Sequence, residues 1–342
     1  MKIYFYKSGN KNLGSERIYI NNLSKWLKPF TKFTKTGNQI IKGPQIFIMS
    51  KYCSPEKIHK AKSFGKTLVG LIHPSDSNKY EMAKLKAADF LIVGSVEEKS
   101  YYQSYSKNVF RFPQIEDYKL SLKKHTKKNK IIFGYHGNLE NLESSNQNYK
   151  IALEKLSKKI DLEFWVIYDK SLGKWKNQPN IKIKTFNWSE NNLIKFLKKI
   201  DIGVVPSTNS FFLDKDFSNS NFLIKLFKKY SDKIGRNNDF IIKFKNNANA
   251  GRSHLFHQAG IPIVADFWPS HFEILSNDNC GYLAHSLNSW YYGLEALAMS
   301  HTVRNKTSIS AFHKFNQLYK IKDWSKSLYI NIKKLYDNNY DR

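Results

Sequence analysis

Short apolar segments alternate with amphipathic helical segments along almost the whole chain, and this alternation limits the possible folds more than any other feature. In the first third, strands are expected at residues 2–6, 46–49, 67–72 and 90–93, with helices at 55–64 and around Ile18, Leu23 and Leu27, ending near Pro29. Buried strands that each lead into a helix are typical of βαβ units and parallel sheets. The sequence therefore predicts an α/β protein.

A second series of the same kind follows a lysine-rich segment. Residues 123–130, KKHTKKNK, contain five lysines and no apolar residue, which predicts an exposed linker. Beyond it we expect strands at 131–135, 163–168, 181–186 and 202–205, a helix at 146–159, and another helix capped by Ser189. The 342 residues suit two domains of about 150 residues each.

The expected domains are residues 1–122 and 131–322, and residues 323–342 are expected to form a helix that crosses back to the first domain. Residues 209–240 interrupt the rhythm and are interpreted as an insertion. Within it, apolar residues from Phe222 to Ile234 form a helical stripe beside Lys225, Lys228, Lys229 and Lys233. The stripe fits either a helix packed on its own domain or a basic amphipathic helix on an anionic membrane surface.

Composition excludes several classes of protein. A hydrophobic fraction of 41% argues against general disorder, and two cysteines cannot build a disulfide framework. The N-terminal apolar stretch is too short and too polar for a signal peptide, and no segment approaches the length of a spanning helix. The net charge of +28 fits a solvated surface, an anionic ligand or a membrane surface, so charge alone selects no function. We expect a reduced, cytoplasmic chain with an anionic partner, peripheral on the inner face of the membrane if the stripe docks there.

The first candidate site is the sequence from Gly134 through His136 and Gly137 to Asn138, directly after an expected strand. A glycine turn at the carboxyl end of a strand lets backbone N–H groups approach a phosphate, and the next helix adds its positive N-terminal end. The pattern is not a complete dinucleotide-binding fingerprint or P-loop. Two glycines after a strand are also common without any ligand.

The second candidate is a basic loop that leads into a short helix and a glycine stop at Gly260. Its candidate ligand-binding residues are Lys243, Lys245, Gly251, Arg252 and Ser253. An arginine near a helix start can place its guanidinium fork on a diphosphate beside backbone donors. The alternative is an ordinary helix–strand unit with a solvated arginine.

Two further positions lie at expected strand ends. Ser270 and Glu273 fit the S-x-x-E capping box, and the same helix start could also face a ligand at the carboxyl edge of the sheet. His73 ends a strand of the first domain, where it would bind a hydroxyl group of a ligand or accept its proton, or serve only as a structural histidine.

No metal site is expected. Asp214 and Asp216 form a D-x-D in the irregular insertion, not at the end of a buried strand. His254 and His257 are three residues apart on a helix, but no third ligand lies nearby in the sequence.

From residue 131 to about residue 297 the chain resembles the donor-binding half of GT-B glycosyltransferases, particularly glycosyltransferase family 4. The matching features, in order, are the strand with its G-x-x-G loop, the basic residue Arg252 eight positions before Gly260, and the Pro-Ser-x-x-Glu stretch that ends at Glu273. The stretch from Gly281 to Arg304 resembles the closing helices of that family. In the first half, Gly14-Ser-Glu-Arg17 and residues 88–95 agree more loosely.

The resemblance implies two Rossmann-like domains that face an interdomain cleft. It also implies transfer of a sugar from a nucleotide diphosphate donor, with retention of configuration and without a metal or cofactor, to a glycan or lipid-linked acceptor. The implied catalytic residues are His73, Arg252 and Lys245, and the implied donor-binding residues are Gly134, His136, Gly137, Asn138, Lys243, Gly251, Ser253, Ser270 and Glu273.

The chain departs from the family at two positions. Leu255 and Asn247 stand where family members usually carry glutamates that contact the donor. A glycosyltransferase-like protein without activity, or another GT-B enzyme such as a nucleotide-sugar epimerase, therefore stays open. A nucleic-acid-binding protein is the remaining alternative, but the lysines are dispersed and no nucleic-acid-binding motif is present, so no nucleic-acid partner is expected.

Overall fold

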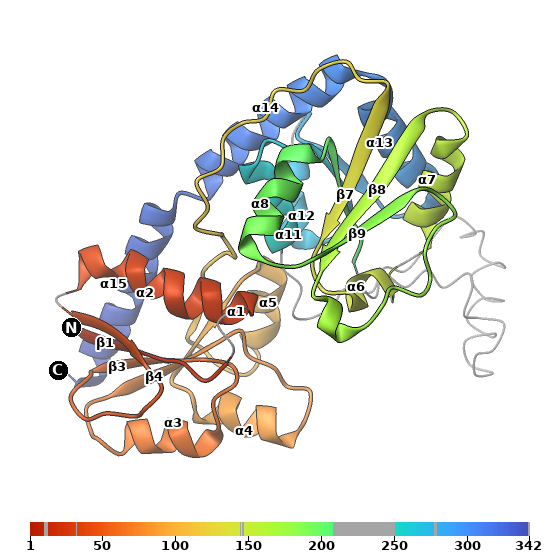
Figure 1. Ribbon diagram of the computed structural model, residues 1–342. Coiled ribbons are helices and arrows are strands. Elements are labelled where there is room, and N and C mark those ends of the chain that lie inside the picture. Colours follow the sequence, from red (N-terminus) through yellow and green to blue (C-terminus); the bar gives the residue numbers. More distant parts are fainter. Residues whose placement is uncertain are drawn as a thin grey trace, which may run out of the picture.

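The computed structural model describes residues 1–9, 13–31, 33–143, 145, 147–207, 250–276 and 279–340. The expected insertion at 209–240, with its D-x-D and its apolar stripe, lies outside the described residues. Lys243, Lys245 and Asn247 lie outside them as well. The described part forms two α/β units, each built on a six-stranded parallel sheet (Figure 1).

The first sheet has the strand order β2-β1-β3-β4-β5-β6. Its strands are β1 (Lys2–Tyr6), β2 (Phe33–Gly37), β3 (Ile46–Met49), β4 (Leu68–Ile72), β5 (Phe90–Val93) and β6 (Val109–Arg111). The helices between them are α1 (Gly14–Glu16), the π-helix η1 (Arg17–Asn22), α2 (Leu23–Leu27), the 3-10 helix η2 (Lys28–Phe30), α3 (Pro55–Lys62), α4 (Lys79–Ala87) and α5 (Val96–Tyr102).

Alternation along the strands places apolar side chains on both faces of this sheet. Ile3 and Phe5 pack on η1 and α2, whereas Tyr4 and Tyr6 lie in the cluster on the opposite face, which α3, α4 and α5 cover. A parallel sheet covered by helices on both faces needs near-continuous apolar strands, and β3 and β5 have them.

The second sheet has the order β12-β11-β10-β7-β8-β9. Its strands are β7 (Lys130–His136), β8 (Asp161–Tyr168), β9 (Ile183–Asn187), β10 (Ile202–Val205), β11 (Ile263–Asp266) and β12 (Tyr282–Ala284). The helices are α6 (Glu140–Glu143), α7 (Asn148–Ser157), the 3-10 helix η3 (Lys170–Leu172), α8 (Glu190–Lys199), α11 (Gly251–Gln258), α12 (Pro269–Leu275), α13 (Leu287–Met299), α14 (His301–Leu318) and α15 (Ile321–Tyr340). The helices α7 and α13 pack on one face of this sheet, and α8, α11 and α14 pack on the other.

The predicted fold class is therefore confirmed. The strands at 2–6, 46–49, 90–93 and 202–205 have the predicted bounds, and the Ser189 side chain caps α8 by accepting a hydrogen bond from the N–H of Asn192 at 3.2 Å. Three strands have no counterpart in the sequence prediction. The strand β2 is polar and largely exposed, and β6 and β12 have only three residues each.

The prediction of an exposed linker at 123–130 is wrong for part of that segment. His125 is buried and its Nε2–H donates to the carbonyl of Gly260 at 2.9 Å. The Lys128 ammonium lies 2.6 Å from the buried carboxylate of Asp201, and Lys123 lies 3.6 Å from the same carboxylate. The lysines therefore neutralise a buried acid of the second unit, and Lys130 already belongs to β7.

The last helix, α15, lies against the first unit. Its buried residues Leu328, Ile332 and Tyr336 belong to the apolar cluster that contains Ile3 and Leu23. Figure 1 shows α15 beside α2, with both chain ends at this unit.

The carboxyl edges of the two sheets face each other. Arg111 ends β6 of the first sheet, and its guanidinium makes a two-pronged ion pair with Glu273 of α12, which follows β11 of the second. The neighbouring helix α5 reaches α12 through Glu97, whose Oε1 accepts a hydrogen bond from the N–H of Ser270 at 3.3 Å. Open parallel sheets bind ligands at such edges. Within the described residues, no helix is long and apolar enough to cross a membrane.

Candidate functional site

The loop after β7 begins at Gly137, which has a φ of +140°. A side chain is disfavoured there, and a Cβ would lie 2.9 Å from Cδ of Arg252 and 2.9 Å from the Tyr135 hydroxyl. The N–H of Gly137 donates to the carbonyl of Ile167 at 3.3 Å. The glycine therefore makes room for Arg252, and its own N–H is engaged within the sheet edge.

Gly134 does not belong to this loop, contrary to the expectation from its G-x-x-G spacing. It lies inside β7, between β8 and β10, and a Cβ there would lie 2.7 Å from the side chain of Ile200. Close packing of Ile200, the residue that follows α8, explains this glycine, so it offers no phosphate cradle.

Arg252 is the second residue of α11 and lies beside the carboxyl ends of β7 and β10. Its Nη1 donates to the carbonyl of Pro206, just after β10, at 2.5 Å, and its guanidinium lies 5.6 Å from the centre of the Tyr135 ring. The side chain is half-buried. A partly exposed guanidinium at a helix start is suited to bind an anion at the carboxyl edge of the sheet.

His136 holds the backbone of Arg252 in place. Its Nε2–H donates to the backbone carbonyl of Arg252 at 3.0 Å, and its ring packs edge-on against Phe256. Burial lowers the pKa of His136 to about 4, so the ring is neutral near pH 7. The predicted donor-binding histidine therefore connects β7 to α11 and is only 8% exposed.

The neighbours of Arg252 differ in their access to solvent. Gly251 is half-buried at the first position of α11, whereas Ser253 is 2% exposed and faces the interior. The Ser253 side chain is therefore covered in the arrangement described here, and its contact with the donor stays a prediction. Leu255 is also buried, at 1% exposure, so the position of the family glutamate belongs to the apolar core.

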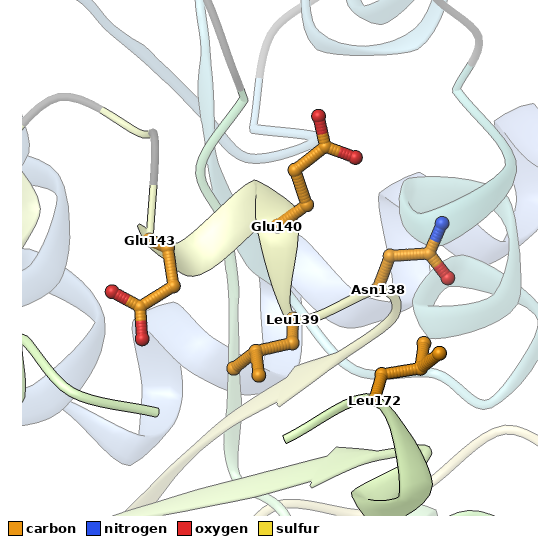
Figure 2. Close-up of a pocket in the computed structure, with 5 residues that line it drawn as sticks. All are labelled: Asn138, Leu139, Glu140, Glu143 and Leu172. Atoms are coloured by element: carbon orange, nitrogen blue, oxygen red, sulfur yellow. The ribbon is translucent and has the colours of Figure 1, made fainter. Parts of the chain in front are cut away.

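The helix that follows the Gly137 loop cannot supply the positive end that the sequence suggested. This helix, α6, has only four residues and starts with Glu140. Beside it lies a hollow of about 300 Å³, lined by Asn138, Leu139, Glu140, Glu143 and Leu172. Figure 2 shows these five side chains, which come from the β7–α6 loop, α6 and η3. Two carboxylates beside this hollow disfavour a phosphate and suit a neutral group with hydroxyl or N–H donors.

The predicted capping box at Ser270 and Glu273 is wrong. Pro269 fits the first position of α12, so the helix starts two residues earlier than the capping box predicts, with Trp268 as its N-cap. Ser270 is 2% exposed, and its backbone N–H is the group that contacts Glu97. The Glu273 carboxylate is engaged by Arg111 and accepts a hydrogen bond from the Tyr319 hydroxyl at 2.7 Å. These contacts lower the pKa of Glu273 against the effect of burial and make it a bridge between the two units.

His73 follows β4 at the carboxyl edge of the first sheet. Its backbone has a φ of +46°, and its Nδ1 lies 3.1 Å from Oε1 of the buried Glu98. Its ring stacks on Tyr19, with the ring centres 6.4 Å apart and an angle of 17° between the planes. Backbone strain in a residue with a side chain is concentrated at functional sites.

Asp266, at the end of β11, is a buried acid that the sequence analysis did not single out. Its Oδ2 accepts a hydrogen bond from the N–H of Ser207 at 2.5 Å, and burial raises its pKa to about 7. It therefore fixes the chain just after β10, next to the carbonyl of Pro206 that holds Arg252.

His254 and His257 pack in the interior. The Nδ1–H of His254 donates to the carbonyl of Gln114 at 2.9 Å, and its ring packs on Tyr319. His257 is 1% exposed. Among the residues that the structure describes, no group of three His, Cys, Asp or Glu side chains could hold a metal ion.

The structure thus brings together Gly137, His136 and Arg252 on the second unit, with Asn138 at the start of the adjacent hollow. It places Ser270 and Glu273 against the first unit. Glu98, Glu97 and Asp266 were missed because their partners lie far away in the sequence. Two sequence signals could have helped. Asp266 lies at the end of a strand, and Glu98 contacts His73, which also lies at a strand end.

Comparisons with known proteins support the architecture. No protein-family model matches the sequence, and no curated protein matches it either. Among solved structures, HepE from Anabaena in complex with UDP-glucose aligns with a TM-score of 0.63 at 11% identity, over 98% of this chain and 100% of HepE. Sucrose-phosphate synthase from Thermosynechococcus elongatus aligns with a TM-score of 0.63 at 9% identity, over 98% of this chain and 99% of the synthase.

TarM, a Staphylococcus aureus protein, aligns with a TM-score of 0.56 at 13% identity, over 92% of this chain. The chain spans only 58% of TarM. At such identities the likeness shows the fold. This chain has the GT-B fold that its resemblance to glycosyltransferases implied.

Proposed function

We propose that this chain is a glycosyltransferase that moves a hexosyl group from a nucleotide diphosphate donor to a glycan or lipid-linked acceptor. The observation that carries the proposal is Arg252, held at the start of α11 beside Gly137 at the carboxyl edge of the second sheet. The likeness to HepE, which was solved with UDP-glucose, supports a nucleotide sugar as the donor. UDP-glucose is therefore the first donor to test.

Electrostatics carries the donor side of the proposed mechanism. The leaving nucleoside diphosphate gains negative charge as the glycosidic bond breaks, so a fixed cation stabilises the transition state more than the ground state. Arg252 has five N–H donors, of which the contact with Pro206 uses one. Lys243 and Lys245, just before it in the sequence, are proposed to add positive charge. The reaction is proposed to retain configuration and to need neither a metal nor a cofactor.

The diphosphate and the neutral part of the donor need different surroundings. We place the diphosphate at Arg252 and Gly251, since Glu140 and Glu143 would repel it from the neighbouring hollow. The hollow has a volume of about 300 Å³ and suits the hydroxyl or N–H groups of the donor, because its carboxylates can accept hydrogen bonds from them.

On the acceptor side, His73 is proposed to bind the attacking hydroxyl or to accept its proton transiently. Its support is its place at the carboxyl edge of the first sheet, with a strained backbone and a buried carboxylate partner. Acid–base groups must lie within hydrogen-bond reach of the proton they handle, so the acceptor sugar would enter beside β4.

A lipid-linked acceptor would place the chain on an anionic membrane surface on the cytoplasmic side, and the net charge of +28 supports such binding. Binding to vesicles that contain anionic lipid, weakened by salt and absent on neutral vesicles, is the expected observation. Equal binding to neutral vesicles would contradict this part of the proposal.

Substitution of Arg252 tests the proposal. Arg252→Ala should lower kcat/KM for sugar transfer by about 10²-fold or more, by analogy with loss of one oxyanion donor. Arg252→Lys should recover only part of the loss, because an ammonium is a point charge and cannot bind two phosphate oxygens in the same fork. Both proteins should remain folded by circular dichroism, and Lys60→Ala, at an exposed lysine of α3, is the matched control with parent activity.

If folded Arg252→Ala transfers sugar at the parent rate, the donor site is misplaced. The buried Leu255, where the family carries a glutamate, favours a second candidate, a glycosyltransferase-like protein without activity. Binding of a nucleotide sugar without any transfer to acceptors would support that candidate. Isomerisation of the donor without transfer would indicate an epimerase.

A further inference from the structure

We propose that Glu98 is a positioning residue that holds the His73 imidazole in one tautomer, with the proton on Nδ1 and the lone pair on Nε2. This inference rests on the proposed function only for the identity of the group that Nε2 meets, the acceptor hydroxyl. The tautomer itself is a property of the protein alone.

The carboxylate of Glu98 is fixed from two sides. Its side chain is 0% exposed, Oε1 lies 3.1 Å from Nδ1 of His73, and Oε2 accepts a hydrogen bond from the N–H of Gly94 at 2.5 Å. Its own backbone N–H donates to Oγ of Ser95 at 3.1 Å, which anchors the first turn of α5. A carboxylate can only accept hydrogen bonds, and a lone pair on Nδ1 would be repelled by Oε1 at 3.1 Å. The two atoms are not aligned as a hydrogen bond in the structure, and it is their close approach that favours the proton on Nδ1.

The position of the imidazole is also constrained by its surroundings. Tyr19 stacks on the ring, and its hydroxyl donates to the carbonyl of Phe112 at 3.1 Å, so the stacking partner is itself fixed. The N–H of His73 donates to the carbonyl of Ile92 at 2.8 Å, and its φ is +46°. A residue with a Cβ adopts such a backbone only where several contacts hold it.

The pair lies on the side of the first unit that meets the second. Glu98 and Glu97 are adjacent in the first turn of α5, and Glu97 contacts the backbone of Ser270 in α12. The His73 side chain is 12% exposed, so the ring is covered on most sides but reachable. This arrangement is what an acceptor hydroxyl at the junction of the two units would require.

The tautomer decides what the ring can do. With the proton held on Nδ1, Nε2 offers a lone pair that accepts a hydrogen bond from a hydroxyl. With the proton on Nε2, the same atom is a hydrogen-bond donor and cannot accept a hydrogen bond from the hydroxyl or take its proton. Glu98 would therefore act on the reaction only through His73.

Glu98→Gln is the diagnostic change because it keeps the size and shape of the side chain. It leaves one acceptor oxygen in place of the two that face the N–H of Gly94 and Nδ1 of His73. If the amide oxygen faces the N–H of Gly94, its NH₂ group faces Nδ1 of His73 and forces the proton to Nε2. Glu81→Gln is the matched control, since Glu81 lies in the first turn of α4 and its carboxylate pairs at 2.7 Å with the buried Lys84 and not with a histidine.

The experiment combines a spectrum with kinetics. Two-bond ¹H–¹⁵N spectra of the full chain, with the His73 signals assigned by their loss in His73→Asn, should show the Nδ1–H tautomer in the parent and in Glu81→Gln. Glu98→Gln should shift His73 to the Nε2–H form. It should also lower kcat for sugar transfer by about 10-fold or more while the donor KM stays unchanged, as expected for loss of acid–base positioning.

A parent spectrum with the proton of His73 on Nε2 overturns the proposal, and this outcome needs neither an active enzyme nor a Glu98 variant. A Glu98→Gln protein that changes the tautomer but keeps the parent kcat overturns the link to the reaction. Absence of sugar transfer by the parent itself would reject the proposed function and leave the tautomer result standing.

Discussion

Gly137 and Arg252 form one unit at the scale of residues, because the absent side chain of the first leaves the space that the second occupies. Two observations require glycine at position 137. Its φ is +140°, and an added Cβ would lie 2.9 Å from Cδ of Arg252. The guanidinium is then held by the Pro206 carbonyl, and the backbone carbonyl of Arg252 is held by His136. Position and charge of the candidate anion site therefore depend on the same few contacts.

Gly137→Ala should weaken binding of a nucleotide diphosphate sugar and lower the free energy of unfolding by about 1–3 kcal/mol, the usual cost of a side chain in such a backbone. The weakened binding follows because Arg252 must move away from the new methyl group. Calorimetric titration and chemical unfolding measure the two effects.

Gly43→Ala is the control for that experiment. Gly43 has a φ of +109° with no atom within 4 Å of an added Cβ, so the variant should lose stability and keep its affinity for the nucleotide sugar. Equal affinity of Gly137→Ala and the parent would contradict the contact between this glycine and Arg252 as the basis of the site.

The sequence identified Arg252 because an arginine between a basic loop and a glycine stop is visible locally. It misled at Gly134, whose spacing resembles a phosphate loop but whose role is packing against Ile200. It also misled at Glu273, where the capping-box pattern concealed an ion pair with Arg111, 162 residues away. Contacts between distant segments leave no local pattern, so such partners could not be predicted.

At the scale of elements, α15 joins the end of the chain to the first unit. Ile332 is 0% exposed within the cluster that contains Leu23, whereas Ile330, on the same helix, is 50% exposed.

Strands with continuous apolar runs were predictable, but β2 was not, because its polar sequence reflects an exposed edge of the sheet.

Ile332→Ala should lower the free energy of unfolding by about 2–5 kcal/mol, since it leaves a cavity in a packed core. Ile330→Ala should change it by no more than about 0.5 kcal/mol, as expected of an exposed position. Urea unfolding of both variants measures the difference. Equal losses would mean that α15 is not packed on the first unit in solution.

At the scale of the whole molecule, the second unit and its linker bury several neutral histidines. Burial lowers the pKa values of His125, His136, His254 and His271 to about 4 and that of His257 to about 3. An unfolded histidine titrates near 6.5, so between pH 6.5 and 4 the unfolded chain binds more protons than the folded one. Stability should therefore fall as the pH is lowered through this range.

His257→Leu should reduce that loss. His257 has no hydrogen-bond partner for either ring nitrogen among the described residues, and removing its titration should recover about 2 kcal/mol at pH 5 relative to pH 7. Melting temperatures of the variant and the parent at pH 7 and pH 5 provide the comparison. Parallel curves would show that His257 is not buried as a neutral ring.

If the two facing sheet edges bind a nucleotide diphosphate sugar, a thermal-shift screen of the full chain against a panel of such donors will detect it. At 100 times its Kd a true donor should stabilise the fold by about 2.7 kcal/mol, and Arg252→Ala should abolish the shift at the same concentration. If no nucleotide sugar raises the melting temperature, while nucleic acid binds with a steep dependence on salt, the chain binds nucleic acid and is not the glycosyltransferase proposed.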